Sequence, residues 1–500
     1  MKITDYLDYI SYEEFHLAST NIDVKGIAYN SKLCKQDFIF VAIPGEKFDG
    51  HNFISNAIEN GAKIIVCEKL PEVDENLCNE KFPGISFLLV KNSRIALAEL
   101  SHAFYGFPTN KLKIIGITGT NGKTTTTFLL KSILEEAGKK VGVIGTVGIF
   151  IGDEKTESNR TTPESLELAQ IFSKMQEAGV EYVIMEVSSH SLVLHRTDTI
   201  NFQVAAFTNL THEHLDFHKT IENYVLAKKK LFDSLQENSI AIANSDDVFA
   251  EQMLQTCKAT KIKFGREEDY AEHFVKIFDE KISKIGSQFK LNFDGKNEVD
   301  FKINLTARYN VENATIAIIA AKKLDIDDNT IKAGLLKSNG APGRLEIVQL
   351  KNGAVAYVDY AHTPDALEKA LVTCKNILEN ESEKAGKLIC VFGCGGDRDK
   401  SKRAIMGKIS TEIADITILT DDNPRTENNE SIIDDIMLGV KKGKETIRIS
   451  DRESAIKKAV ELASNKEDII IVAGKGHENY QIIGTETKYF SDMDILKLFA

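Results

Sequence analysis

Short runs of hydrophobic residues alternate with amphipathic, helix-length segments along the chain, which predicts an α/β protein. In the first part, residues 92–101 show a helical pattern, and the Gly/Pro segment 106–110 that follows is typical of a domain boundary. The strands expected before it are residues 38–43, 63–67 and 85–90. We therefore expect a first domain at residues 1–108.

Buried-type strands alternate with helices again in the middle of the chain, as in a largely parallel sheet. These strands are expected at residues 113–118, 140–144, 181–186, 202–207 and 240–243. Residues 260–306 break the pattern with a shorter and more polar alternation, which predicts an antiparallel insertion. We place this second domain at residues 109–338, because the turn-forming segment 339–343 follows it.

The last part of the chain predicts a second doubly wound, Rossmann-like domain at residues 339–500. Its strands are expected at residues 355–359, 388–392, 416–420 and 469–473. A chain of 500 residues agrees with this division, because domains average about 150 residues. The predicted fold class is therefore α/β with three domains.

Composition narrows the classes of function. The chain carries 62 basic and 74 acidic side chains, a net charge of -12, which disfavours a nucleic acid as partner. The longest apolar stretches are strand-sized, shorter than the roughly 20 residues of a membrane span, and the N-terminus lacks the apolar core of an export signal. The seven cysteines form neither a disulfide framework nor a Cys-x-x-Cys pair. We expect a cytoplasmic protein with reduced cysteines.

The strongest chemical signal is a phosphate-binding loop. Residues 118–125 read Thr-Gly-Thr-Asn-Gly-Lys-Thr-Thr, between a predicted strand and a helix expected at 125–136. The glycines let backbone N–H groups surround phosphate, Lys123 adds a positive charge, and Thr124 can bind magnesium. Gly116 lies one residue too early for the usual spacing of this loop. The loop still predicts that the central domain is a phosphate-loop ATPase domain.

A carboxylate is expected near this loop, because magnesium prefers carboxylate and hydroxyl oxygens. Glu186 ends an apolar strand, at the sheet edge where doubly wound folds bind their ligands. The polar cluster Ser188-Ser189-His190 follows it directly. Glu186 is therefore the predicted metal partner of Thr124.

The histidine-rich segment 208–218 raises zinc as a rival metal. It does not fit a helical His-Glu-x-x-His site, because Asp216 stands where the second histidine belongs, and the segment 477–481 fails likewise at Gln481. A magnesium–phosphate environment, with His214 as a further ligand or polariser, fits better. For His212 and His218 the alternative of solvated loop histidines stays open.

The chain resembles the Mur ligases, because a set of short motifs occurs in the order seen in that family. The motifs are residues 118–124, 186–190, 208–216, 227–232, 310–313, 342–344, 359–365, 392–399, 422–425 and 474–478. Residues 30–32 and 49–54 also resemble the family's UDP-sugar module. The set is most similar to the ligases that add meso-diaminopimelate to UDP-N-acetylmuramoyl-L-alanyl-D-glutamate in peptidoglycan precursor synthesis.

The resemblance implies four groups of site residues. ATP would be bound by Gly119, Thr120, Asn121, Gly122, Lys123, Thr124, Thr125, Asn313, Arg344 and Asp359. The UDP-sugar dipeptide would contact Ser31, Thr161, Thr162, Ser188 and Arg196. Diaminopimelate would contact Arg398, Asp422, Asn423, Pro424, Arg425, Gly474 and Glu478. Mg²⁺ would be held by Thr124, Glu186, His214 and a carbamylated Lys228.

The implied chemistry is ATP-dependent amide-bond formation. A carboxylate is a poor acyl donor, so its oxygen attacks the γ-phosphate of ATP, and an amine then displaces phosphate from the acyl phosphate. The amine must be neutral, so a base is needed, either His362 or the departing phosphate. Lys123, Glu186, His214, Lys228 and His362 are the predicted catalytic residues, and we expect a monomer.

Three alternatives remain open on the sequence alone. The same ligase could add L-lysine, although a guanidinium such as Arg425 suits the second carboxylate of diaminopimelate, with Glu478 on the distal ammonium. Another Mur-type or folylpolyglutamate-type ligase shares the central domain, but Ser31 and residues 49–51 favour a UDP module. A phosphate-loop NTPase switch is the remote alternative, and it leaves residues 422–425 unexplained.

Overall fold

The computed structural model describes residues 2–16, 18, 22–45, 48–71, 78, 80–211, 213–267, 269–381 and 386–500. The chain forms two compact units, one of Met1–Lys123 with Gly138–Lys263 and one of Thr124–Ala137 with Phe264–Ala500. Within the described part, no helix is long and apolar enough to cross a membrane.

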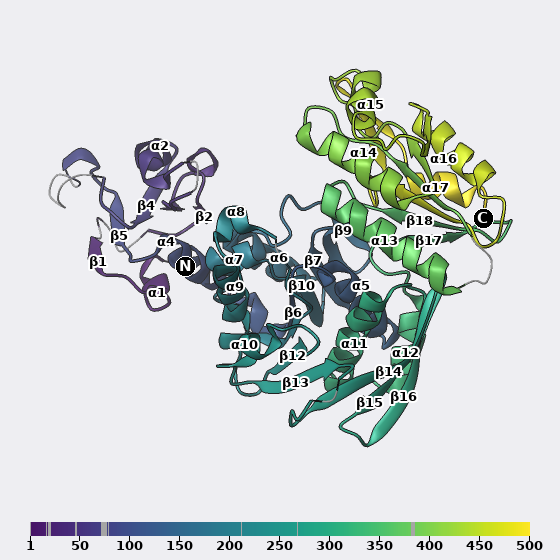
Figure 1. Cartoon of the computed structure of the whole chain (residues 1–500). Helices are drawn as coiled ribbons and strands as arrows, with labels where there is room; N and C mark the ends of the chain where they lie inside the picture. Colours follow the sequence, from purple (N-terminus) through teal and green to yellow (C-terminus); the bar gives the residue numbers. More distant parts are fainter. Residues whose placement is uncertain are drawn as a thin grey trace. The chain divides into compact units, whose positions relative to one another are not determined.

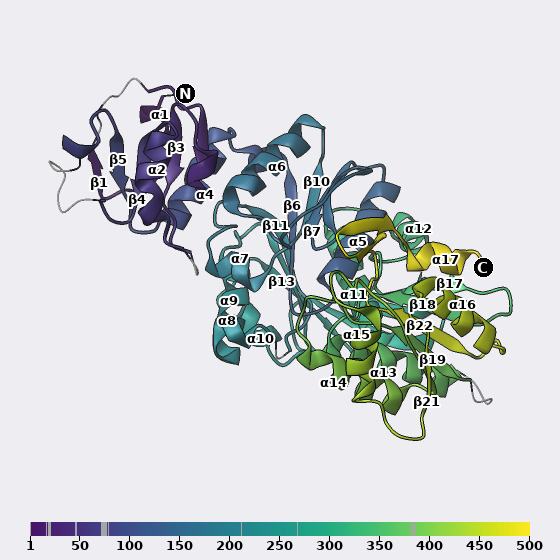
Figure 2. The same ribbon diagram turned by 90° about the horizontal axis from the view of Figure 1, so that it is seen from above.

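A five-stranded sheet begins the first unit, with strand order β1-β5-β4-β3-β2. Its strands are β1 (Glu14–His16), β2 (Gly26–Ala28), β3 (Phe38–Val41), β4 (Ala62–Cys67) and β5 (Ser86–Leu89). All neighbours pair in parallel except β1 and β5. Helices α2 (Ile54–Glu59) and α4 (Ser93–Phe104) cover opposite faces (Figure 2), because alternate residues of β3 and β4 point into two separate cores. The short elements around it are α1 (Thr4–Leu7), η1 (Ser31–Leu33), η2 (Gly50–Phe53) and η3 (Pro108–Lys111).

The rest of the first unit contains the mainly parallel part of an 11-stranded sheet, with the strand order β12-β11-β6-β10-β7-β8-β9. Its strands are β6 (Lys113–Thr118), β7 (Val141–Gly145), β8 (Gly148–Ile151), β9 (Glu154–Thr156), β10 (Tyr182–Glu186), β11 (Phe202–Phe207) and β12 (Ile240–Asn244). Its helices are α6 (Ser165–Glu177), α7 (Ser189–Val193), α8 (Leu215–His218), α9 (Ile221–Asp233) and α10 (Ala250–Leu254). Parallel pairing brings the carboxyl ends of β6, β10 and β11 to one edge, with Glu186 opposite Ile117 and Phe207 opposite Thr118.

The second unit begins with three helices and the antiparallel strands of the 11-stranded sheet. The helices are α5 (Lys123–Glu136), α11 (Arg308–Lys323) and α12 (Asp328–Lys337), and the strands are β14 (Phe274–Ser283), β15 (Gly286–Phe293) and β16 (Asn297–Ile303). Strand β13 (Thr260–Gly265) runs from the first unit into the second. Gly334 lets α12 approach α5, since a Cβ there would lie 2.5 Å from the Ile133 Cα. The predicted antiparallel insertion is confirmed.

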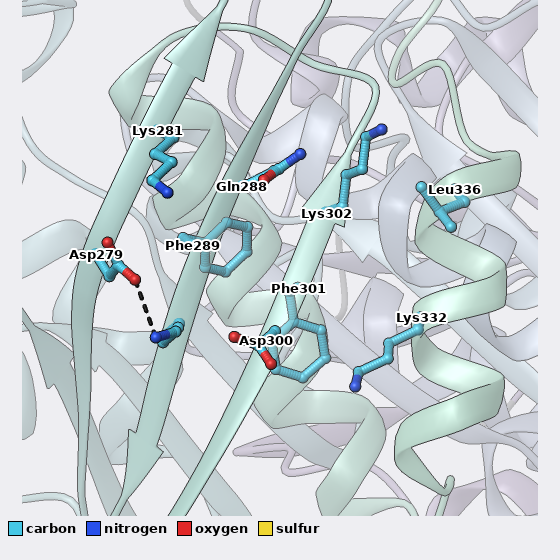
Figure 3. A pocket seen from close by; sticks show the side chains of 10 residues that line it. Asp279, Lys281, Gln288, Phe289, Asp300, Phe301, Lys302, Lys332 and Leu336 are labelled. Carbon is cyan, nitrogen blue, oxygen red and sulfur yellow. Dashed lines mark ion pairs between the residues drawn. The ribbon is translucent and has the colours of Figure 1, made fainter.

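A shallow hollow of about 440 Å³ lies on this antiparallel sheet and α12 (Figure 3). Its lining mixes lysines with aspartates, and Lys290 pairs with Asp279 at 3.0 Å. None of the predicted site residues is among the residues that line it. The hollow is therefore a charged surface apart from the predicted site.

The C-terminal sheet is ordered β17-β18-β22-β19-β20-β21 and is parallel except for β17. Its strands are β17 (Glu346–Gln349), β18 (Val355–Asp359), β19 (Leu388–Phe392), β20 (Ile416–Leu419), β21 (Glu445–Arg448) and β22 (Ile469–Ala473), followed by the hairpin β23 (Tyr480–Ile483) and β24 (Glu486–Tyr489). Helices α13 (Pro364–Glu381), α14 (Ser401–Ile413) and α15 (Asn429–Met437) pack on one face, and α16 (Arg452–Leu462) and α17 (Asp492–Lys497) pack on the other (Figure 1).

The predicted α/β class with three sheet-containing domains is confirmed, and the predicted long strands are all present. The strands that the hydrophobic pattern missed are short or lie at sheet edges. β9, for example, is three exposed polar residues, so it carries no apolar signal. Helix α5 begins at Lys123, two residues earlier than expected.

Candidate active site

The phosphate loop follows β6 and is held by the segment after β11. Asn209 accepts from the Thr120 N–H through its carbonyl, at 2.8 Å, and from the Asn121 N–H through Oδ1, at 3.0 Å. Gly119 has φ +143° and would bring a Cβ within 1.9 Å of Thr208 Oγ1, so only glycine fits there. The loop is therefore fixed in shape by the backbone and side chains of Thr208 and Asn209.

Two lysines converge on one carbonyl of this loop. Lys123 Nζ and Lys228 Nζ each donate to the Gly119 carbonyl at 2.8 Å. Lys228 lies on α9, is 1% exposed, and stands over the Tyr224 ring. Burial, together with the charge of Lys123, holds the pKa of Lys228 well below that of an ordinary lysine. Its neighbours on α9 differ, since Lys229 pairs with Asp233 and Lys230 is exposed.

Glu186 ends β10 beside the start of the loop and is 1% exposed. Its carboxylate accepts from the Thr146 N–H at 2.9 Å and from Thr146 Oγ1 at 3.2 Å. A Cβ on Gly145 would lie 2.3 Å from Glu186 Oε1, so the glycine leaves room for this carboxylate. Among the described residues, no three His, Cys, Asp or Glu side chains gather to hold a metal.

The residues predicted for the sugar dipeptide meet near Glu186. Thr162 Oγ1 donates to the Glu186 carbonyl at 2.8 Å and accepts from the Ser188 N–H at 3.1 Å. Arg196 Nη1 donates to the Thr162 carbonyl at 3.0 Å, and the Thr161 and Thr146 hydroxyls are 3.0 Å apart. Ser31 takes no part in these contacts and lies on η1 of the N-terminal sheet domain.

Glu164 is a functional candidate that sequence reasoning missed. It is 4% exposed and pairs with Arg196 at 3.2 Å, Arg160 at 3.2 Å and Arg94 at 3.6 Å. One carboxylate thus faces three guanidinium groups, which suits the binding of an anionic substrate. Its position directly after Thr161-Thr162-Pro163 was the available sequence signal for a site residue. No sequence pattern indicates that it pairs with Arg94.

The histidines after β11 form an aromatic cluster at α8 and α9. The ring of His214 lies 5.1 Å from that of His190, and the residue has φ +57° and an exposed side chain. His218 is buried and within 2.8 Å of Ser189 Oγ through Nε2, so it is not a solvated loop residue. Burial, with His190 and Lys228 nearby, lowers the pKa of His218 to about 4. His212 lies outside the described residues.

The second unit carries the other residues predicted for ATP. Asn313 is buried on α11, with Oδ1 3.4 Å from Thr126 Oγ1 of α5. Arg344 stands over the Tyr360 ring at 5.5 Å. Asp359 accepts from the N–H groups of Leu345 at 2.8 Å and Ala361 at 2.9 Å, and burial raises its pKa.

His362 lies exposed just after this carboxylate. Its Nδ1 is 2.8 Å from the Tyr360 carbonyl oxygen. Because a carbonyl can only accept, this bond requires the proton on Nδ1 and leaves the lone pair on Nε2. In a neutral His362 this bond would therefore leave Nε2 as the nitrogen that accepts a proton, as a general base requires.

Two loops predicted to bind the amino acid meet at the carboxyl edge of the C-terminal sheet. Asn423 Nδ2 donates to Glu478 at 3.0 Å, and Asn423 Oδ1 accepts from Lys475 Nζ at 3.2 Å. A Cβ on Gly474, which has φ +118°, would lie 2.6 Å from Asp422 Oδ2. Lys475, which sequence reasoning missed, lies in the same segment 474–478 and is fully buried.

The two arginines predicted for this site differ in their surroundings. Arg425 donates through Nη1 to the carbonyls of Gly396 at 2.9 Å and Asn423 at 3.3 Å. Pro424 packs beside it, so close to Gly396 that a Cβ there would lie 1.9 Å from the Pro424 carbonyl. Arg398 is exposed, and its Nη1 lies 3.4 Å from the Asp397 carbonyl. Arg425 is therefore hydrogen-bonded to the backbone of the loops, whereas Arg398 is exposed to solvent.

Asp421 gives a pH-dependent test of this region. Burial, with Glu430 nearby, raises its pKa to about 7, well above the value of about 3.9 for an exposed aspartate. The folded protein therefore binds this proton more tightly, so stability falls as the pH rises from about 4 to about 7. Asp421→Asn should raise Tm at pH 8 by about 2 to 4 °C, the shift that about 1 kcal/mol gives a domain of this size. The gain in Tm should disappear near pH 4. An equal gain at both pH values would contradict the raised pKa of Asp421.

Comparison with known proteins agrees with this geometry. The Mur ligase family, catalytic domain, matches residues 23–105, the Mur ligase middle domain matches residues 117–321, and the Mur ligase, glutamate ligase domain, matches residues 343–476. The chain is 46% identical over 500 residues to the UDP-N-acetylmuramoyl-L-alanyl-D-glutamate–2,6-diaminopimelate ligase of Clostridium tetani, covering 99% of each chain. It is 43% identical to ligase 1 of the same name from Clostridium acetobutylicum, covering 100% of this chain and 99% of that one.

A solved structure of a ligase with this name has a TM-score of 0.72 and 29% identity, and the match covers 100% of this chain and 98% of that chain. The fold and the phosphate loop, with Lys123 and the buried Lys228 on one loop carbonyl, are those of an ATP-dependent ligase. The chain belongs to the Mur ligase family. The resemblance drawn from the sequence motifs is therefore confirmed.

Proposed function

We propose that the chain joins meso-diaminopimelate to UDP-N-acetylmuramoyl-L-alanyl-D-glutamate, at the expense of ATP, in peptidoglycan precursor synthesis. The observation that supports this acceptor is the meeting of the Asp422–Arg425 loop with the Gly474–Glu478 loop, in a chain whose relatives are named for this reaction. We assign the UDP-sugar, ATP and amino acid to domains at residues 1–108, 109–338 and 339–500.

In the first step, the substrate carboxylate oxygen attacks the γ-phosphorus of ATP. The bond from that phosphorus to the β,γ-bridging oxygen breaks, so an acyl phosphate forms and ADP leaves. Lys123, at the loop, and Arg344 would offset charge between the two anions. Thr161, Thr162, Ser188 and Arg196 would hold the sugar dipeptide, with Glu164 orienting Arg196.

Magnesium would be held by donors near the loop. Glu186 supplies a buried carboxylate at the strand end next to the loop, and Thr124, His214 and Lys228 would complete the set. A lowered pKa favours the neutral amine of Lys228, which can add to carbon dioxide and, on losing a proton, become an anionic carbamate. When bound, magnesium supplies positive charge between the nucleotide and the substrate carboxylate.

In the second step, the neutral amine of the amino acid attacks the acyl carbon, and phosphate leaves as the amide forms. His362 would accept the proton of the attacking amine at Nε2, because its Nδ1 donates to the Tyr360 carbonyl. Arg425 would pair with the distal carboxylate of diaminopimelate and Glu478 with the distal ammonium, while Asp422, Asn423, Pro424, Gly474 and Arg398 line the site.

Omission of single substrates tests the reaction class. Phosphate release from ATP should require both UDP-N-acetylmuramoyl-L-alanyl-D-glutamate and diaminopimelate, and should equal the amount of amide formed. A phosphate-loop NTPase switch would release phosphate without an amino acid. A folylpolyglutamate-type ligase would require glutamate as the acceptor. Either result would reject the proposal.

Arg425→Ala should raise KM for meso-diaminopimelate by at least about tenfold, because the distal carboxylate of the bound amino acid would lose its guanidinium partner. Both residues carry a Cβ, so the backbone cost at φ +54° is common to them. KM for ATP should change little, as measured by steady-state kinetics. Arg448→Ala, which removes an exposed arginine of the same domain, is the control and should keep both constants. An unchanged diaminopimelate KM in Arg425→Ala would show that Arg425 does not pair with the distal carboxylate.

A further inference from the structure

A buried arginine lies behind the proposed amino-acid site. Arg452 is the first residue of α16 and is 1% exposed. Its Nε and Nη2 donate to the two carboxylate oxygens of Asp492, each at 2.7 Å. Nη1 donates to the carbonyl of Asp421 and Nη2 to the carbonyl of Ala473, each at 3.0 Å. Four of the five N–H groups of this guanidinium therefore donate hydrogen bonds inside the protein.

Those two carbonyls belong to the two loops of the site. Asp421 immediately precedes Asp422, and Ala473 immediately precedes Gly474. Their strands, β20 and β22, are not neighbours in the sheet, because β19 lies between them. A single side chain on α16 thus spans three strands and ties the backbone at the start of one loop to that of the other.

Asp492 fixes the guanidinium on its far side. It is fully buried in the first turn of α17, and α17 packs against α16. A bidentate carboxylate sets both the position and the plane of a guanidinium, so the directions of the remaining N–H groups are set as well. A pair that served packing alone would not need donors aimed at two loop carbonyls.

We propose that Arg452, held by Asp492, is a positioning residue that sets the spacing of the Asp422–Arg425 and Gly474–Glu478 loops for the incoming amino acid. The inference rests on the proposed function. Lysine cannot replace Arg452, because an ammonium is a compact point donor and cannot bridge a carboxylate and two carbonyls in one plane.

Arg452→Lys and Asp492→Asn test this role. In each, kcat/KM for meso-diaminopimelate should fall by about 10- to 100-fold, the scale expected when a reacting group is misplaced by about 1 Å. KM for ATP and for the UDP-sugar dipeptide should stay within about twofold, because their proposed residues receive no bond from Arg452. Asp492→Asn preserves the volume and keeps Arg452, so it also serves if Arg452→Lys does not fold.

Ile456→Ala is the matched control. It removes buried volume from the same helix one turn later and should lower Tm without a selective rise in KM for diaminopimelate. An unchanged diaminopimelate constant in a folded Asp492→Asn, or an equal rise for all three substrates, would overturn the positioning role. If the unmodified enzyme accepts no amino acid at all, the proposed function itself fails, which is a separate result.

Discussion

Lys228→Arg is expected to lower turnover by about 100- to 1,000-fold, the scale of losing one preorganised electrostatic group. Arginine keeps the positive charge, but it stays protonated and cannot form a stable carbamate. The site is 1% exposed and already contains Lys123, so a permanent second cation is unfavourable there. Steady-state kinetics with saturating substrates give the measurement.

The neighbouring lysine provides the control for this change. Lys229 lies one residue along α9 and is also buried, but it pairs with Asp233. Lys229→Arg should therefore retain most activity. Lys228→Glu should recover part of the activity lost in Lys228→Arg, since it restores an anionic oxygen. Full activity in Lys228→Arg would show that no carbamate is needed.

Lys123→Ala is expected to reduce turnover by a similar factor, about 100-fold or more, while the fold survives. Lys123 Nζ donates to the carbonyls of Gly119 and Thr120, so the side chain belongs to the loop and not to a hydrophobic core. Lys131→Ala, two turns later on α5, removes an i,i+4 pair with Glu135 and should leave turnover unchanged. Turnover near that of the unmodified enzyme in Lys123→Ala would refute the phosphate-loop role, provided that Tm is unchanged.

The sequence predicted those parts of the site in which the chemistry is local. The loop at Lys123 and the strand-end carboxylate Glu186 each follow an apolar strand, so their placement at one sheet edge follows from parallel pairing. The loops at Asp422 and Gly474 also follow strands of one predicted sheet. The hydrogen bond that joins the two loops, between Asn423 and Glu478, could not be predicted from the pattern of strands.

Residues that act through long-range contacts could not be found in this way. Arg452 meets Asp421, Ala473 and Asp492, which lie 31, 21 and 40 residues away. In the sequence it is one charged residue at the start of a helix, a position that usually faces solvent. Glu164 is similar, since its bond to Arg94 needs the packing of α4 against α6.

The choice of acceptor is the central claim, and a competition assay tests it most directly. The purified enzyme would receive ATP, UDP-N-acetylmuramoyl-L-alanyl-D-glutamate, and equal concentrations of meso-diaminopimelate and L-lysine, and mass spectrometry would identify the nucleotide-linked products. The account predicts the diaminopimelate product in at least about tenfold excess, because lysine has no second carboxylate to pair with Arg425. Equal amounts of the two products, or an excess of the lysine product, would contradict it.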